Sequence, residues 1–168
     1  LPPPPPDPGN DTRLTVLLAK WSTSALADES DVNTKMLHLD RTEAERQQDA
    51  LRRLRRSLDS DGRRARAKEY KALANKQFGK EAWRVALVGY LAGVWMLRLD
   101  HEIDDPPCPL LLANHLSELE SVVAALGPAV QPLAAGEASA TLRASLLVNL
   151  AAAALKLTEW RIARGACE

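Results

Sequence analysis

The sequence predicts an all-α fold, and three observations lead to this prediction. Alanine and leucine, both strong helix formers, supply 27 and 28 of the 168 residues. Valine and isoleucine together supply 11 residues and aromatic residues only 7, so the types that favour strands are scarce. No proline lies between Pro8 and Pro106, which leaves a long stretch able to run as helix. We therefore expect an antiparallel bundle of about five helices.

The chain is divided into a leader and one domain. Residues 2–6 are five consecutive prolines, which form a stiff polyproline II segment with no core to join. Residues 1–10 are therefore read as a proline-rich leader or tether, and residues 11–168 as a single helical-bundle domain. A mature end after removal of a signal peptide, a stalk or an excised piece would all begin in this way.

Capping residues and apolar spacing place the five helices. The first begins after Asp11 and the second after Asp31, because aspartate is a good N-cap. The third is expected to run unbroken through Gly79, with a bend there, and its half from Ala82 to Leu97 is apolar on nearly every face. That half must be the buried centre of the domain. The predicted helices cover residues 12–26, 32–58, 63–99, 110–126 and 138–164.

The second and third predicted helices are longer than their neighbours. At 1.5 Å per residue they would extend about 40 Å and about 55 Å, against about 25 Å for the fourth. We therefore expect them to project beyond the bundle as an antiparallel hairpin whose tip is the turn Asp59 to Gly62.

The formal charge of zero hides an uneven distribution. Lysine plus arginine and aspartate plus glutamate each number 22, but residues 41–84 contain 14 basic and 7 acidic residues. One interpretation is that the hairpin is a basic arm for an anionic partner. That partner would be an acidic protein surface, lipid head groups or, least favoured, nucleic acid. The alternative is a pair of helices that charge merely keeps solvated. The predicted partner-binding residues are Arg52, Arg53, Arg55, Arg56, Arg63, Arg64 and Arg66.

Two cysteines bear on the compartment. Cys108 and Cys167 lie outside any zinc-binding spacing, and an even, small number suits one disulfide or two idle thiols. We expect the disulfide, which would add about 4 kcal/mol by the chain-entropy estimate. With the leader, this predicts an exported protein, periplasmic or extracellular.

Catalytic and cofactor signatures are missing from the sequence. It has no GxSxG nucleophile elbow and no phosphate loop, and none of its three histidines completes the ExxH step of a di-iron bundle. His115 and Glu118 share a helical face, but two ligands rarely hold a metal. No uncharged run reaches the roughly 18–20 residues of a membrane span. We expect no enzyme, no cofactor, no metal and no membrane span.

Two family resemblances add to this interpretation. Residues 39–48, which lead into the basic hairpin, resemble the helix starts of small periplasmic helical chaperones and metal-stress sensors. Segments 15–18, 90–98 and 157–160 are similar to helices of interleukin-11-like four-helix cytokines, which implies a long overhand loop near 28–62.

The function predicted first is therefore non-catalytic. It is an exported, bacterial periplasmic helical protein that binds another protein as an adaptor, chaperone, immunity or secretion-apparatus component. A secreted cytokine-like signalling protein is the alternative, and a nucleic-acid-binding hairpin is the third candidate.

Overall fold

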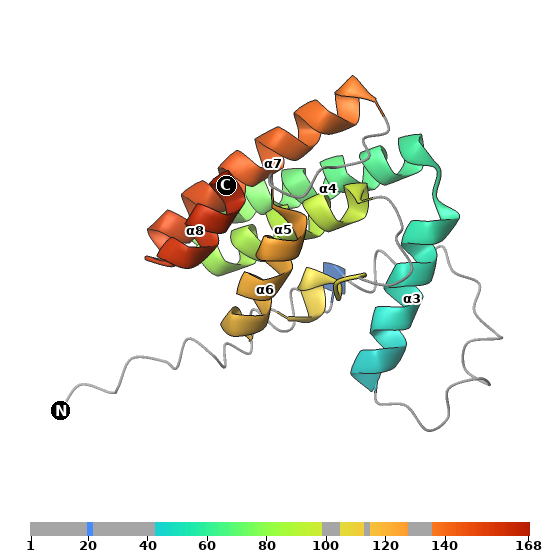
Figure 1. Ribbon diagram of the computed structural model, residues 1–168, viewed down its shortest axis with the longest axis horizontal. Coiled ribbons are helices and arrows are strands. Elements are labelled where there is room, and N and C mark those ends of the chain that lie inside the picture. The colour runs from blue at the N-terminus through green and yellow to red at the C-terminus, as the bar shows by residue number, and fades with distance from the viewer. Residues whose placement is uncertain (1–19, 22–42, 99–104, 113–114, 128–135) are drawn as a thin grey trace.

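The computed structural model describes residues 20–21, 43–98, 105–112, 115–127 and 136–168. Within these ranges the chain is helical and has no strand, which confirms the all-α prediction (Figure 1). The leader and the predicted first helix, apart from residues 20–21, lie outside the described residues, as does the start of the predicted second helix. The elements are α3 (Glu43–Ser57), α4 (Ser60–Gly79), α5 (Trp83–Leu97), the 3-10 turn η1 (Pro109–Leu111), α6 (Leu116–Leu126), α7 (Glu137–Lys156) and α8 (Trp160–Cys167).

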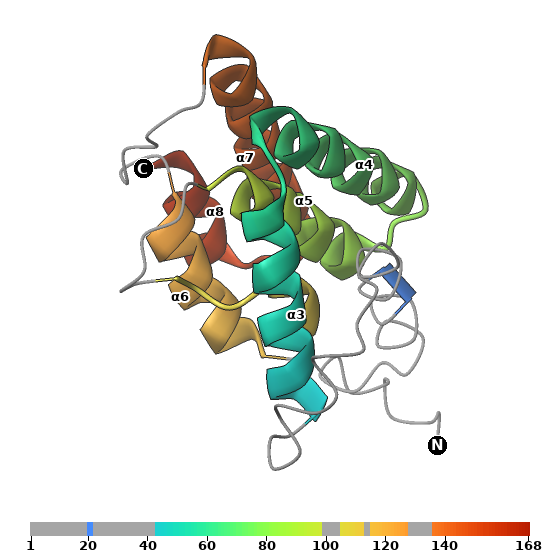
Figure 2. The same ribbon diagram turned by 90° about the vertical axis from the view of Figure 1, so that its right-hand side faces the viewer.

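Helix α5 is the centre of the fold, as the sequence predicts. Every residue from Val85 to Met96 is buried. Helices α4 and α7 pack along it, η1 contacts it, and α3 crosses the end of the α4–α5 pair (Figures 1 and 2). A helix without a polar face can exist in water only when neighbours cover it on all sides.

The predicted third helix is wrong as a single element. The chain reverses at residues 80–82, so α4 and α5 form an antiparallel hairpin instead of one long rod. The Glu81 amide donates to the Phe78 carbonyl and the Ala82 amide to the Gln77 carbonyl, each at 3.0 Å. This is the Schellman arrangement, and the left-handed residue that it requires is Glu81, with φ 61°, not Gly79.

The predicted fifth helix divides in the same way. The Thr158 amide donates to the Leu155 carbonyl at 3.1 Å and the Glu159 amide to the Ala154 carbonyl at 2.9 Å, which separates α7 from α8. Thr158 also has φ 61°. Neither glycine nor proline marks this turn, and Gly165, the residue after the predicted end of the fifth helix, lies inside α8.

The two hairpins are structural repeats. Trp83 and Trp160 each begin the second helix of a hairpin, 77 positions apart, and they open the matching tetrads Trp-Arg-Val-Ala and Trp-Arg-Ile-Ala. The residues before them, Ala82 and Glu159, have nearly equal backbone angles, φ −82° ψ 65° and φ −88° ψ 73°. Stacked helical hairpins of this kind bury a continuous core between neighbours. No repeat was expected from the sequence.

The predicted projecting arm is also absent from the described structure. Because the chain turns back after Gly79, α4 lies along both α5 and α7 (Figure 1). The turn that leads into α4 is close to the prediction: the Asp59 carboxylate accepts a 2.7 Å hydrogen bond from the Gly62 amide as the N-cap of α4.

Helix α7 has one further property. Within the described residues it alone is long and apolar enough to cross a membrane, and 44% of its apolar window is buried inside the fold. Its buried face packs on α5 and α8.

The positive φ of Thr158 leads to a stability prediction. A β-branched residue pays a steric cost in the left-handed region that glycine does not. We expect Thr158→Gly to raise the free energy of unfolding in urea by about 1 kcal/mol. Ala144→Gly, at an exposed position inside α7, should instead lower it by about 1 kcal/mol. A loss of stability in Thr158→Gly would contradict the turn described above.

Candidate functional site

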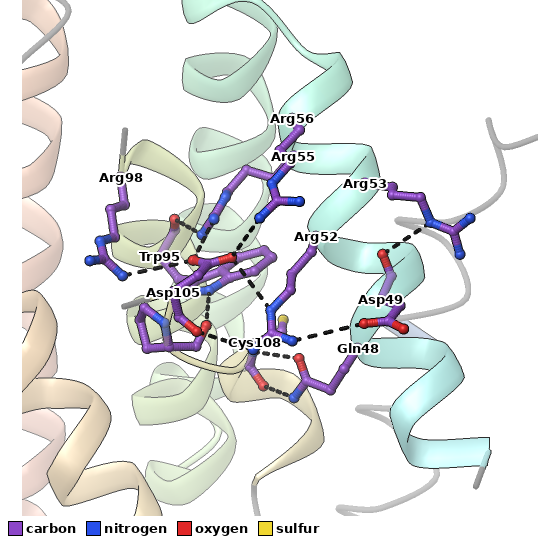
Figure 3. Close-up of polar contacts among 11 residues, drawn as sticks. Gln48, Asp49, Arg52, Arg53, Arg55, Arg56, Trp95, Arg98, Asp105 and Cys108 are labelled. Atoms are coloured by element: carbon purple, nitrogen blue, oxygen red, sulfur yellow. Dashed lines mark hydrogen bonds and ion pairs between the residues drawn. The ribbon is translucent and has the colours of Figure 1, made fainter. Parts of the chain in front are cut away.

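Four arginines surround the carboxylate of Asp105, and three of them were predicted to bind a partner (Figure 3). Arg55 is nearest, with its Nη2 at 2.5 Å from Oδ1. Arg52 Nε lies 3.4 Å from Oδ2, Arg98 Nη1 lies 3.7 Å from Oδ1, and Arg56 Nη2 lies 3.9 Å from Oδ2. A single carboxylate therefore draws α3 and the end of α5 to the segment 105–108.

Arg55 is fully buried, and its place corrects the prediction of an exposed arm. Its guanidinium lies 4.2 Å from the centre of the Trp95 ring, and Nη1 donates to the Trp95 carbonyl at 3.3 Å. Trp95 in turn donates from Nε1 to the Pro106 carbonyl at 2.9 Å. Arg55 is thus a core residue that joins α3 to α5, and it is not available to a partner.

A second set of hydrogen bonds strengthens this junction. The Gln48 side chain accepts from the Cys108 amide at 2.7 Å and donates to the Cys108 carbonyl at 3.3 Å (Figure 3). Arg52 Nη2 donates to the Asp105 carbonyl at 3.1 Å. Helix α3 is consequently fastened along its length to the segment 105–108, mainly through polar groups.

The remaining predicted arginines also have local partners. Arg63 donates to the carbonyls of Arg55 and Leu58, at 3.0 and 3.1 Å, which closes the link between α3 and α4. Arg53 Nε donates to the Asp49 carbonyl at 3.4 Å. Arg64 pairs with Asp61, and Arg66 with Glu69 at 3.1 Å. Partner binding by these residues stays a prediction, and the contacts seen here stabilise the fold.

The predicted disulfide is wrong in this structure. Cys108 and Cys167 are both unpaired, the first buried and the second exposed. In the prediction the fifth helix runs unbroken over residues 138–164, with Cys167 just beyond its end. The turn at 157–159 sends α8 back along α7 instead.

A cavity of about 510 Å³ lies between α3, η1 and the start of α6. His115 and Glu118 line it, opposite Glu45, Asp49 and Arg52. Within the described residues no group of three or more side chains could hold a metal ion. Residues 101–104, part of a polar loop in the sequence, lie outside the described ranges.

A second cavity, which the sequence did not indicate, lies between α4 and α7. It has a volume of about 580 Å³. Lys71 Nζ donates to Ser145 Oγ at 2.6 Å across it. We call this the α4/α7 groove. Its lining residues are Lys68, Lys71, Glu137, Ala138, Thr141, Leu142 and Ser145.

A second polar contact joins the same two helices one turn further along. We call this contact and the Lys71–Ser145 hydrogen bond the polar rungs. Asn149 Nδ2 donates to Asn75 Oδ1 at 3.4 Å, and Tyr90 Oη donates to the same oxygen at 2.7 Å. Burial raises the pKa of Tyr90, which keeps its hydroxyl protonated and able to donate. With its oxygen occupied in this way, Asn75 keeps an Nδ2 donor for other groups.

The rungs have a common geometry. Lys71 and Asn75 are four residues apart on α4, and their partners Ser145 and Asn149 are four residues apart on α7. Positions four apart share a helical face, so the two helices run parallel and present one row of polar groups. The Trp-Arg-(Val/Ile)-Ala repeat aligns α4 with α7 in the sequence, but it does not give these pairs, because it is spaced by 77 residues and the paired residues by 74.

Comparison of the chain with family models, with curated protein sequences and with solved structures finds no match.

The Asp105 cluster predicts unequal effects of removing its charges. Asp105→Asn leaves the buried Arg55 cation without its closest counter-charge, so the free energy of unfolding in urea should fall by about 3 kcal/mol. Arg56→Met removes a half-exposed cation at the edge of the cluster and should cost less than about 1 kcal/mol. Equal losses in the two variants would be inconsistent with the burial described here.

The cysteines predict a labelling pattern. Burial raises the pKa of the Cys108 thiol to about 12, so almost no thiolate forms there at neutral pH, and the side chain is enclosed. We expect iodoacetamide at pH 8 to label Cys167 alone in the native protein, and both cysteines after unfolding without reductant. If the mass spectrum shows no label on the unfolded, unreduced protein, the two cysteines are joined in a disulfide and the free thiols described here are wrong.

Proposed function

We propose that this protein is a non-catalytic adaptor that binds an acidic, extended segment of another protein in the α4/α7 groove. The observation that supports this best is the row of polar rungs, Lys71 to Ser145 and Asn75 to Asn149, next to the exposed Lys68. Protein–protein interaction with an acidic partner is also what the charge distribution predicts, and the surface proposed for it here is the α4/α7 groove.

The groove has the chemistry that an acidic peptide requires. Lys68 and Lys71 are ammonium donors for carboxylates, and Glu137 is the single acidic residue in the lining. The asparagine side chains of the second rung belong to the type that offers both a donor and an acceptor, which matches the amide and carbonyl groups of a peptide backbone. Charge would thus select acidic segments, and the amides would hold the main chain.

The spacing of the rungs also suits an extended chain. Residues four apart on a helix are about 6 Å apart along its axis, and two residues of an extended strand span about 6.6 Å. Successive rungs would therefore meet every second residue of the peptide. Since α4 and α7 both pack on the buried α5, this spacing is fixed before the peptide binds, which lowers the cost of ordering the site.

The alternatives have less support. The groove lining contains no aromatic ring on which a base could stack, which disfavours a nucleic-acid strand there. The cytokine-like alternative requires an overhand loop near 28–62, whereas residues 43–57 form α3. Export stays a prediction from the leader, without the disulfide that favoured it.

Binding can be tested with fluorescein-labelled peptides of eight residues rich in aspartate and glutamate, each made with a free and with an amidated C-terminus. We expect fluorescence anisotropy to rise with wild-type protein and the affinity to fall with added salt. Lys68→Glu/Lys71→Glu should weaken binding at least tenfold. Lys76→Glu, an exposed residue of α4 outside the groove lining, should change it less than twofold.

The asparagine rung provides a separate variant. Asn149→Ala removes an amide without changing charge, so we expect a severalfold loss of affinity that persists at high salt, with an unchanged circular dichroism spectrum. If no acidic peptide binds, or if the double lysine variant binds as tightly as Lys76→Glu, the groove is not the binding site.

A further inference from the structure

The α7–α8 hairpin exposes more large apolar side chains than the α4–α5 hairpin does. Among the described residues, four large hydrophobic side chains are exposed, and three of them lie on α7 and α8. They are Val148, Leu155 and Trp160, with 68%, 48% and 67% of their surface accessible. We call these three residues the open end.

The equivalent residues of the α4–α5 hairpin indicate what this surface could contact. The residues 77 positions earlier are Lys71, Phe78 and Trp83. Lys71 donates to Ser145 of α7, and Lys156 of α7 lies over the Trp83 ring, with Nζ 5.5 Å from its centre. Phe78 packs edge-on against Trp83, with ring centres 4.7 Å apart. In the first hairpin, therefore, Lys71 and Trp83 face α7, and Phe78 is covered by Trp83.

The first hairpin also has a covered flank. Trp21 is buried, and its ring lies against Gly89 of α5, where a Cβ would come within 2.8 Å of it. Figures 1 and 2 both place the segment 20–21 on the side of the α4–α5 hairpin away from α8. Trp21 thus occupies the place on that flank where a second copy would have to stack head to tail, which favours pairing of two open ends.

We propose that the open end is a self-association surface, on which a second copy of this chain packs its own α7 and α8 about a two-fold axis. The charged residues adjacent to Leu155 and Trp160 in the sequence, or on α8 with their ion-pair partners, balance one another: Lys156, Arg161 and Arg164 against Glu120, Glu159 and Glu168. Two of these basic residues already pair locally, Arg164 with Glu168 at 3.5 Å and Arg161 with Glu120 at 4.0 Å. A two-fold contact places the same patch on both partners, so a balanced patch does not repel its copy.

The interaction is expected to be weak. Three large side chains on each copy form a small apolar centre, so the interface belongs near the lower end of the size range for specific contacts. Tryptophan at such a centre typically supplies a large share of the binding energy. Dissociation should therefore fall in the micromolar range, and Trp160 should dominate it.

Sedimentation velocity of the full chain tests this proposal. Between 5 and 200 µM we expect the wild-type protein to shift from monomer toward dimer, and Trp160→Glu and Val148→Glu to remain monomeric over the same range. Leu73→Glu, which places the same charge at the exposed apolar position on α4, should dimerise like the wild type. Circular dichroism of each variant checks that it is folded.

Two results would overturn the proposal. If the wild-type protein is monomeric at 200 µM, the open end does not bind a second copy and is left for a helix of another protein. If folded Trp160→Glu still dimerises, the dimer contact lies at another surface. Neither result bears on the α4/α7 groove, because peptide binding is measured at protein concentrations and with variants of its own.

Discussion

The all-round burial of α5 is the constraint on which the rest of the structure depends. Every residue from Val85 to Met96 is buried, so helices must lie on all sides of this element. Helices α4 and α7 can both be its neighbours only if the chain reverses at residues 80–82 and crosses to a second hairpin. The α4/α7 groove follows from the same requirement, because two parallel helices on one buried support leave a furrow between them.

Helix α3 is attached to the end of α5 by polar groups as well as by buried apolar side chains. Helix α3 contributes few buried apolar side chains, chiefly Leu51 and Leu54, and depends on Arg55 to reach Trp95 and Asp105. A fully buried arginine is tolerated because its charge meets a carboxylate, an aromatic face and a carbonyl together. The most basic part of the sequence is thus partly an internal fastening, which explains why charge counting alone overestimated its exposure.

The sequence predicted helix content and the buried core well and the turns poorly. Composition and the apolar run of α5 identified the fold class, because helix propensity depends on residue type and burial is indicated by the local spacing of apolar residues. The reversals at Glu81 and Thr158 depend on a left-handed backbone at residues other than glycine, which no local signal announces. The third and fifth helices were therefore wrong as single elements, and the projecting arm and the disulfide, which were predicted with those helices unbroken, failed with them. The groove was missed because Lys71 and Ser145 meet only after those turns.

The attachment of α3 also bears on how the molecule opens. Because polar contacts to the short segment 105–108 provide much of its hold, α3 can detach at a lower free energy than the apolar centre around α5. Once detached, it would present arginines at 52, 53, 55 and 56 to solvent. Each is a cleavage point for trypsin, so limited digestion would report the opening of this one helix while the two stacked hairpins remain intact.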